Sequence, residues 1–372
     1  MTTLDGLIPG IVDAHVQQWN PRRTPWSATP AARLYRFVPR AGDRVFSVAV
    51  PQAEREYVLT PRTVARAYET RQYLADVAPV AGTVGVPVES VVLVESYWRP
   101  PIYTDTDAAD QIVDEIAYLL GLPFGIGLAP TLGALMVRSD PRAEGFVERL
   151  DRRLALSDRI VGIQTTATRH PDPRIRDGGT DDGMVASAEY LTGLAAVAER
   201  GLAVEVFVYS HQLHEVIALA REYPETTVIV DHFGAPVGVF GPVGQRTGTT
   251  AAERADIVRL WRERMTSLAA LPNVVIKLSG LALPVLGYGR RPAGNIGTRE
   301  TLAHMIGPLV RHVVAHFGAE RVMFGSNLPI DKPNATMDMI VGALVDVLAP
   351  WGGDQVLANV FRETARQVYR LA

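Results

Sequence analysis

Eight short apolar runs, separated by longer stretches with helical periodicity, constrain the fold of this chain more than any other feature. The runs are continuous rather than alternating, which is typical of parallel strands covered on both faces. Eight strand–helix units favour a (β/α)8 barrel of the TIM type over a doubly wound sheet, which usually has fewer strands. We expect strands at Ile11–Val16, Ser90–Ser96, Phe124–Pro130, Ile160–Thr166, Ala203–Tyr209, Thr227–Asp231, Val274–Ser279 and Val322–Ser326.

The stretches between these runs predict the helices. Thr60–Pro61 and Asp140–Pro141 each combine a capping residue with a proline that suits the first helical position. Further helices are expected at Asp107–Leu120, Met184–Arg200, Gln212–Glu222, Ala252–Leu271, Arg299–Phe317 and Met337–Leu348, with an extra C-terminal helix at Asp354–Leu371. No linker divides the chain, so we expect one barrel domain over residues 1–372.

Three long connections stand out, at 21–59, 235–250 and 281–298. All three follow the ends of expected strands, the face on which barrels of this kind place their active sites. They could therefore cap the C-terminal face above a substrate. Surface decoration or a contact between subunits explains any one of them equally well.

Composition excludes several classes of site and partner. The net charge of −3 with interspersed signs predicts no nucleic-acid or anionic-membrane partner. The chain has no cysteine, which rules out disulfides, thiolate metal sites and a cysteine nucleophile. No basic-then-apolar N-terminal segment and no apolar run of ~18 residues occurs, so we expect a cytoplasmic protein. A small-molecule substrate and, by prior, a homodimer are expected.

The first expected strand lies in the motif IVDAHVQQW. Because side chains alternate along a strand, Asp13, His15 and Gln17 should share one face. His15 could bind metal, act as acid or base, or orient a carbonyl group, although a hydrogen-bonded structural role is as good an explanation. Gln17 cannot titrate and is a poor zinc ligand, so it suits the orientation of substrate.

Two later strand ends carry further candidates. VIVDHFGAP places His232 where an apolar strand meets a turn, with Asp231 expected to face the other way as a partner for Arg or Lys. RVMFGSNLPIDKP places Asn327 toward the barrel mouth, where an amide can hold water or substrate but cannot act as a base. Asp331 could be a displaced acid or base, or form a loop ion pair.

Lys277 lies inside the apolar run NVVIKLSGLA, with Ser279 on the same face. A buried ammonium is costly unless it is paired, and Glu205 in the fifth expected strand is a plausible partner. A desolvated lysine with a lowered pKa could alternatively serve as a base or a Schiff-base nucleophile.

The remaining candidates would bind substrate. Tyr97, Trp98 and Arg99 crowd one strand end and could shape a pocket for a planar or carboxylated ligand, or simply pack under a loop. Arg169 could grip a substrate carboxylate or lie in a solvated loop. His211 lies three residues before His214, a spacing that indicates a metal site only weakly.

With these motifs in place, the chain resembles the amidohydrolase superfamily, specifically its amidohydrolase-2 branch. That branch includes L-fuconolactonase-like and 2-pyrone-4,6-dicarboxylate lactonase-like hydrolases and aminocarboxymuconate-semialdehyde decarboxylases. The likeness runs through IVDAHVQQW, VESYWRPP, GIQTTA, VIVDHFGAP, NVVIKLSGL and RVMFGSNLP to a closing ETARQVYRL. No single motif is decisive, but their order and spacing are specific.

The resemblance implies roles for individual positions. His15 matches the first histidine of the family's H-x-H pair, and Gln17 stands where the second should be. His232 matches the histidine of the sixth strand, and Asn327 stands at the aspartate of the eighth. Gln164 replaces an arginine that holds substrate carboxylates.

His211 lies near a fifth-strand position where some members place a ligand. So few ligands predict no metal cofactor; if zinc were bound, His15, His232 and His211 would hold it.

The leading hypothesis is a metal-independent hydrolase that acts on a lactone-like or similarly activated carbonyl. His15 or His232 would act as base or electrophile, while Gln17 and Asn327 orient water and substrate. The alternatives are a non-hydrolytic lyase of the decarboxylase kind, a cyclase or isomerase on the same barrel, or a catalytically inactive barrel that binds a ligand.

Overall fold

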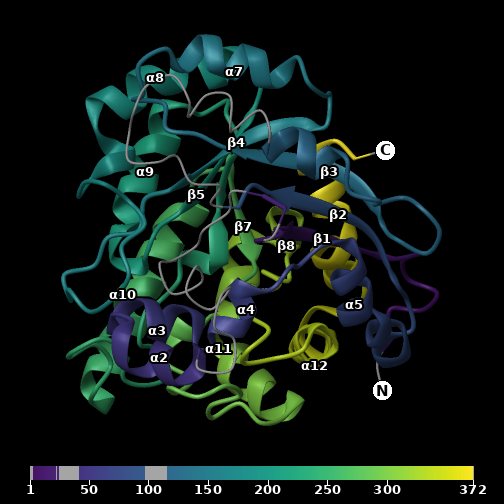
Figure 1. Ribbon diagram of the computed structural model, residues 1–372, viewed down its shortest axis with the longest axis vertical. Coiled ribbons are helices and arrows are strands. Elements are labelled where there is room, and N and C mark those ends of the chain that lie inside the picture. The colour runs from purple at the N-terminus through teal and green to yellow at the C-terminus, as the bar shows by residue number, and fades with distance from the viewer. Residues whose placement is uncertain (1–2, 22, 25–41, 97–114, 372) are drawn as a thin grey trace.

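The computed structural model describes residues 3–21, 23–24, 42–96 and 115–371, and its strands form a parallel barrel (Figure 1). The eight strands pair in chain order: β1 Ile11–Val16, β2 Val88–Val94, β3 Thr131–Arg138, β4 Ile160–Thr166, β5 Ala203–Phe207, β6 Val228–Val230, β7 Val274–Leu278 and β8 Val322–Phe324. The backbone N–H of Asn327 donates to the His15 carbonyl at 2.9 Å, and that of Gln17 to the Leu328 carbonyl at 3.0 Å. These bonds join the last strand end to the first and confirm the predicted (β/α)8 barrel.

Helices surround this barrel (Figure 1). They are α2 Gly42–Ala49, α3 Gln52–Val58, α4 Pro61–Ala65, α5 Thr70–Val84, α7 Phe146–Leu154, α8 Ala188–Glu199, α9 Leu213–Glu222, α10 Ala251–Ala269, α11 Arg299–Phe317, α12 Met337–Ala358 and α13 Thr364–Tyr369. The predicted cap at Thr60 is confirmed, since its side chain accepts from the N–H of Arg62. The expected helix Asp107–Leu120 lies mostly outside the described residues, and 115–120 is helical.

The prediction for the third strand is wrong. The expected segment Phe124–Pro130 forms turns, and β3 begins directly after it at Thr131. Gly125 and Gly127 adopt φ values of 77° and 62°, which an extended strand does not allow. Ile126 and Leu128 are 70% and 97% exposed, whereas the second half of β3 is buried, so of the large apolar residues of this segment only Phe124 belongs to the core.

An apolar cluster fills the barrel interior, and the C-terminal helix closes one end of it. Its members are Val12, Ala14, Val92, Val94, Ala134, Met136, Ala203, Ile229, Val275, Met323, Ala365 and Tyr369. Ala365 and Tyr369 come from α13, so the extra C-terminal helix packs against the interior residues of the strands. A second, larger cluster lies between the strands and the surrounding helices.

The long connections after β6 and β7 pack against each other. The N–H of Gly238 donates to the Val285 carbonyl at 2.9 Å, and the side-chain amide of Gln52 donates to the Gly244 carbonyl at 2.7 Å. The first long connection, expected over 21–59, is partly helical because it contains α2 and α3. Through Gln52 of α3, it joins the other two connections on the side where the strands end.

One helical stretch is apolar enough to span a membrane by length and composition, namely Met337–Tyr369. Half of its most apolar window is buried inside the fold, and α12 packs along α11 and α5. A core helix has these properties as well.

Candidate active site

An irregularity in β1 separates His15 from Asp13. The pairing of β1 with β2 shifts register between Asp13 and Val16. Val12 and Ala14 face the barrel interior, so Asp13 points outward to α5, where it accepts from the Tyr73 hydroxyl at 2.8 Å, and it also accepts from the Ser326 N–H at 2.7 Å. The expectation that Asp13 and His15 share a face is wrong, because simple alternation does not survive this shift.

Glu205, Asp231 and Lys277 form a polar layer above the apolar interior. Each comes two residues after an interior apolar position of its own strand, so alternation turns its side chain inward. All three are fully buried. The Lys277 ammonium lies 2.7 Å from Oε2 of Glu205 and 3.4 Å from Oδ1 of Asp231. The predicted Lys277–Glu205 pair is confirmed; Asp231 does pair with a lysine, but the expectation that it faces away from the site is wrong.

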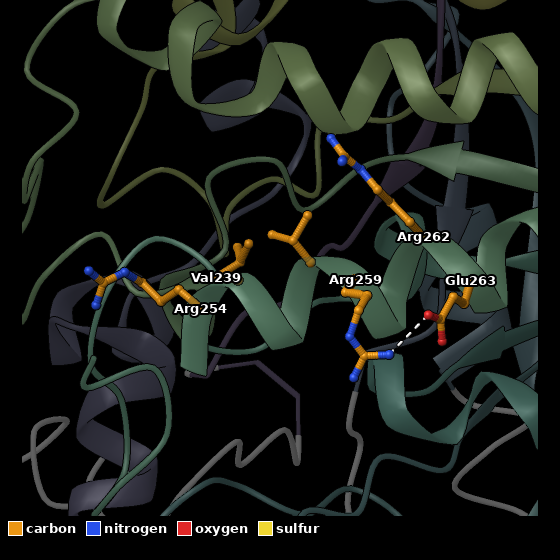
Figure 2. A pocket seen from close by; sticks show the side chains of 7 residues that line it. Val239, Arg254, Arg259, Arg262 and Glu263 are labelled. Carbon is orange, nitrogen blue, oxygen red and sulfur yellow. Dashed lines mark hydrogen bonds and ion pairs between the residues drawn. The ribbon is translucent and has the colours of Figure 1, made fainter. Parts of the chain in front are cut away.

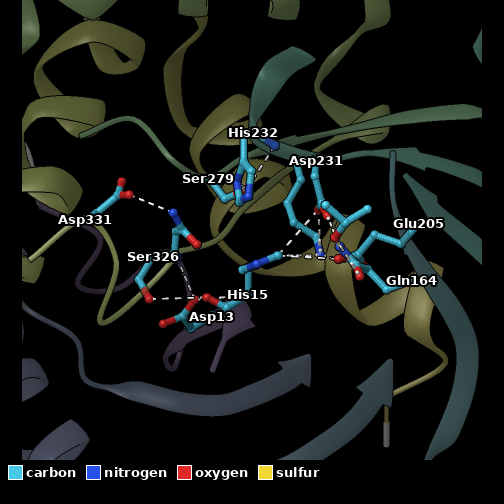
Figure 3. Close-up of polar contacts among 12 residues, drawn as sticks. Asp13, His15, Gln164, Glu205, Asp231, His232, Ser279, Ser326 and Asp331 are labelled. Atoms are coloured by element: carbon cyan, nitrogen blue, oxygen red, sulfur yellow. Dashed lines mark hydrogen bonds and ion pairs between the residues drawn. The ribbon is translucent and has the colours of Figure 1, made fainter. Parts of the chain in front are cut away.

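The ring of His15 completes this layer (Figure 3). Its Nδ1 lies 3.3 Å from the Lys277 ammonium and 3.4 Å from a carboxylate oxygen of both Glu205 and Asp231. Burial by itself lowers the pKa of His15, but the charge of Asp231 and hydrogen bonds to both carboxylates outweigh it, so that this pKa lies above its ordinary value. Protonated His15 and Lys277 would balance the two carboxylates.

The layer shifts the pKa values of its acids in opposite directions. Burial and the neighbouring charge of Asp231 raise the pKa of Glu205. Burial also opposes ionisation of Asp231, yet the positive charges of Lys277 and His15 hold its pKa well below the usual range. The layer therefore favours the ionised form of Asp231.

Nε2 of His15 is buried and has no hydrogen-bond partner among the described residues. If His15 is neutral and Nδ1 accepts from Lys277, its proton sits on Nε2; if it is protonated, Nε2 also carries a proton. In either state this atom is an unpaired donor. A substrate oxygen could accept from it.

His232 is held in a strained backbone conformation. Its φ is 52°, that of Phe233 is 43° and that of Ala235 is 30°, a run that non-glycine residues rarely adopt and that is enriched at functional sites. Ser279 lies 2.8 Å from Nδ1 of the imidazole. Gly280 leaves room for the ring, since a Cβ there would be 2.8 Å from Cγ of His232.

The surroundings of His232 differ from those of His15. Its ring centroid lies 4.6 Å from that of Phe207 and 4.8 Å from that of His15. Burial, together with the positive charge of His15, lowers the pKa of His232 to about 3. His232 is therefore a neutral imidazole beside a ring whose protonated form is favoured.

Asn327 contacts a buried acid at the end of β8. Its side-chain N–H donates to Oδ1 of Asp331 at 2.7 Å, while the N–H of Ala282 donates to the other oxygen at 2.8 Å. Burial, partly offset by these bonds, raises the pKa of Asp331 to about 7. The alternative of a loop ion pair for Asp331 does not hold, because Lys332 pairs with Asp76 at 2.6 Å instead.

Of the other predicted site residues, Gln164 lies in the polar layer, whereas Arg169 and His211 form their contacts elsewhere. Gln164 joins the polar layer, with Nε2 3.4 Å from Oδ2 of Asp231, and Gln17 is half-buried beside His15 in the chain. Arg169 pairs with Asp177 and Asp182, at 2.9 and 3.2 Å. His211 packs its ring 5.2 Å from that of His170, away from the polar layer.

The predicted aromatic pocket residues Tyr97, Trp98 and Arg99 lie outside the described residues.

A zinc ion would have to compete with Lys277 for these side chains. His15, Asp231 and His232 could offer three ligand atoms within 4.8 Å of one another, whereas a tetrahedral zinc ion holds its ligand atoms about 3.4 Å apart. The Lys277 ammonium already contacts both His15 and Asp231. His211 does not belong to this group, so the ligand set suggested for zinc is not assembled.

Sequence reasoning missed three contributors to the site. Asp231 was placed on the wrong face, although its spacing from the apolar Ile229 was the signal that could have found it. The contact of Phe207 with His232 could not be inferred, because Phe207 is an ordinary apolar residue of an expected strand. Ser279 was noted only as a neighbour of Lys277, and its contact with His232 depends on two strands meeting in space.

A groove of about 520 Å³ lies apart from this layer, on the surface of α10 (Figure 2). It is lined by Val239, Arg254, Ala255, Val258, Arg259, Arg262 and Glu263. Arg259 pairs with Glu263 at 2.9 Å. None of its lining residues belongs to the polar layer or contacts His15 or His232, so it adds no group to the candidate active site.

Comparison with curated proteins finds partial relatives. The uncharacterized protein y4mH of Sinorhizobium fredii is 30% identical over 183 residues, which cover 49% of this chain and 52% of that protein. An L-fucono-1,5-lactonase of Burkholderia multivorans is 28% identical over 221 residues, covering 56% of this chain and 69% of its own. The first alignment therefore spans about half of the relative's length.

Solved structures match over nearly the whole chain. An amidohydrolase from Burkholderia multivorans, crystallised with bound zinc, covers 98% of this chain and 100% of its own with a TM-score of 0.65 and 22% identity. Amidohydrolase 2 from Bifidobacterium longum subsp. infantis gives a TM-score of 0.54 at 19% identity, covering 98% of this chain and 100% of its own. These likenesses concern the fold.

The family resemblance predicted from the motifs is confirmed by the family model described as Amidohydrolase, which matches residues 129–371. That match takes in β3 to β8 and the closing helix, and with them Lys277, Asp231, His232 and Asn327. The chain belongs to the amidohydrolase family of enzymes.

Proposed function

We propose that this protein hydrolyses a lactone-like ester of a small organic molecule, with His232 as general base and His15 as general acid, and without a bound metal. One observation carries the proposal. The two imidazoles face each other at 4.8 Å, one beside two carboxylates and the other against Phe207 and Ser279. Environments that separate the pKa values of two neighbouring groups are typical of acid–base pairs.

His232 suits the base because it stays neutral. Ser279 Oγ can accept from Nδ1–H of His232, which would leave the Nε2 lone pair to take a proton from water. Attack of that water on the ester carbonyl forms the C–O bond, and the proton passes to His232. An activated ester needs less assistance than an amide, so one positioned base could suffice.

His15 suits the acid because its unpaired Nε2–H can be donated. It can stabilise the negative charge that develops on the carbonyl oxygen, and then supply a proton to the departing ring oxygen. The carboxylates of Glu205 and Asp231 favour the positive charge on His15 that this role needs. Asn327 and Gln17 would orient water and substrate.

The relatives suggest which lactones to test first. The curated L-fucono-1,5-lactonases act, by name, on a sugar-derived 1,5-lactone. We propose sugar lactones of this ring type as the first substrate class, with other lactones as the next. A cytoplasmic location and a homodimer stay predictions.

The decisive experiment measures hydrolysis of a lactone panel by chelator-treated enzyme, with proton release as the signal. We expect turnover, and a loss of 10²–10⁴-fold in kcat as an order-of-magnitude estimate in both His15→Ala and His232→Ala. His316→Ala on the exposed face of α11 is the matched control and should retain full activity. Full activity in both site variants, or no turnover of any lactone, would contradict the proposal.

The same assay in ¹⁸O-labelled water separates hydrolysis from the alternatives. Hydrolysis incorporates one labelled oxygen into the product carboxylate, whereas a lyase or a cyclase incorporates none. A catalytically inactive binding barrel would release no protons with any substrate. The lyase alternative is tested because Asn327 stands where an acid would activate water, and a lyase does not need that acid.

A further inference from the structure

Lys277 places a positive charge inside the only group of side chains, among the described residues, that could offer three ligands to a metal ion. We propose that this ammonium is a resident cation that takes the place of a divalent metal and prevents the side chains of His15, Asp231 and His232 from binding one. The inference rests on the proposed metal-free chemistry of the same site. Its test, however, measures metal binding and does not depend on turnover.

The contacts of Lys277 resemble those of a coordinated ion. An ammonium has three N–H donors, and three polar atoms lie close to Nζ: Oε2 of Glu205 at 2.7 Å, Oδ1 of Asp231 at 3.4 Å and Nδ1 of His15 at 3.3 Å, which accepts only when His15 is neutral. Two of these residues are also the candidate metal ligands. A metal ion could use them only by displacing the ammonium or by accepting its repulsion.

Electrostatics make that displacement costly. Lys277 is fully buried, so its charge is poorly screened by solvent, and it has no surface to move to within the described fold. Its Nζ lies 3.3 Å from Nδ1 of His15 and 3.4 Å from Oδ1 of Asp231, whereas a zinc ion lies about 2.0–2.2 Å from its own ligand atoms. A dication among the same atoms would face a fixed positive charge at close range.

The contacts of Lys277 extend beyond a pair with Glu205. Glu205 also accepts a hydrogen bond from the Tyr369 hydroxyl, which donates to Oε2 at 3.2 Å. A single partner would leave two N–H donors of the buried ammonium without acceptors, and Nζ lies within reach of Asp231 and His15 as well. Those two contacts direct its charge toward the proposed acid–base pair and toward two of the three candidate metal ligands.

The experiment compares zinc binding by the wild type and by Lys277→Met, which keeps the side chain's length and removes its charge. We expect zinc affinity, measured by calorimetry, to rise by roughly 100-fold or more in the variant. Cobalt should give the visible absorption of a tetrahedral site in the variant and not in the wild type. The matched control is Lys332→Met, because Lys332 is the chain's other lysine and pairs with Asp76 outside the ligand group. It should bind zinc no better than the wild type.

Further variants keep the proposal open to refutation. Glu205→Gln combined with Lys277→Met removes one charge of each sign and serves if the single variant does not fold; it should bind zinc as the single variant does. Adding His232→Ala to either should abolish the new site. Unchanged zinc affinity in folded Lys277 variants would overturn the proposal, as would tight zinc binding by the wild type that is lost on His232→Ala. Absence of lactone turnover would leave these results intact and would count against the proposed function alone.

Discussion

The imidazole rings of His15 and His232 stand edge to face, with centroids 4.8 Å apart and planes inclined by 64°. His15 approaches from β1 with carboxylates around its Nδ1, whereas His232 follows β6 and packs against Phe207. The same pair of rings thus meets two opposite electrostatic environments within one contact. This contrast determines how the site should respond to pH.

The pH dependence of kcat/KM for lactone hydrolysis should be broad and asymmetric. The base must be unprotonated, so activity rises with pH through the pKa of His232 at about 3. The acid must be protonated, so activity falls with rising pH only through the raised pKa of His15, above its ordinary value. We expect a plateau across the acidic range and a decline on the alkaline side.

His15→Gln tests the assignment of the alkaline limb. Glutamine can still donate a hydrogen bond but cannot titrate, so residual activity should lose its alkaline decline. His316→Gln, on exposed α11, should keep the wild-type profile. A wild-type decline on the acidic side near pH 6 to 7, an ordinary range for histidine, would contradict a base whose pKa is lowered to about 3.

Gly280→Ala should disable the base without removing it. A Cβ at this position would lie 2.8 Å from Cγ of His232, so the ring must shift. A displacement of that kind can lower kcat by about 100-fold.

Gly183→Ala is the matched control. Gly183 has a φ of 72°, close to the 63° of Gly280, but a Cβ there meets nothing within 4 Å. It shares the backbone strain of the test variant and lacks the clash, so it should lose stability with little change in kcat. Equal activity losses in the two variants would show that backbone strain, rather than the position of His232, is responsible.

Asn327→Asp restores the acid expected at the end of β8, and we expect it to destabilise the protein. The new carboxyl would lie against Asp331, whose Oδ1 now accepts from the Asn327 amide at 2.7 Å. Two adjacent carboxylates cannot both ionise cheaply, so the free energy of unfolding should fall by about 1–3 kcal/mol near neutral pH and by less in acid. Urea unfolding at two pH values measures this. A variant that is equally or more stable at both would contradict the contact.

Asp331→Asn should flatten the dependence of stability on pH. The pKa of Asp331 is raised to about 7 in the folded protein, so the folded state holds a proton that the unfolded state has released. This group therefore stabilises the fold fully below its ordinary pKa, and that contribution is lost as pH rises toward about 7. The asparagine of the variant cannot titrate, so the variant's free energy of unfolding should not show this decrease.

Urea unfolding from about pH 5 to about pH 8 would measure the difference, which should be on the order of 1 kcal/mol per pH unit. Asp256→Asn, exposed on α10, is the control and should follow the wild type. Parallel curves for Asp331→Asn and the wild type would rule out a titrating Asp331 in this range.

Most of the barrel could be predicted because apolar runs and helical periods are local properties. The strands at Ile11–Val16 and Ile160–Thr166 agree with the structure residue for residue. The third strand could not be located, because Phe124–Pro130 is as apolar as β3 and only its two glycines with positive φ distinguish it as a turn.

The site was predictable where a charge stood in an apolar strand. Lys277 and Glu205 had to be paired, and they are. The turn of His15 into the polar layer accompanies a register shift in β1, and the position of the His232 ring accompanies the left-handed conformation of its backbone. Neither property can be inferred from the local sequence pattern.

The hydrogen bond from Tyr369 to Glu205 has a consequence for biosynthesis. The ribosome adds this phenol after all eight strands, so a nascent chain holding every other member of the polar layer still lacks the support beneath Glu205. The polar layer therefore gains this hydrogen bond only when α13, which follows all eight strands in the chain, packs against the barrel interior.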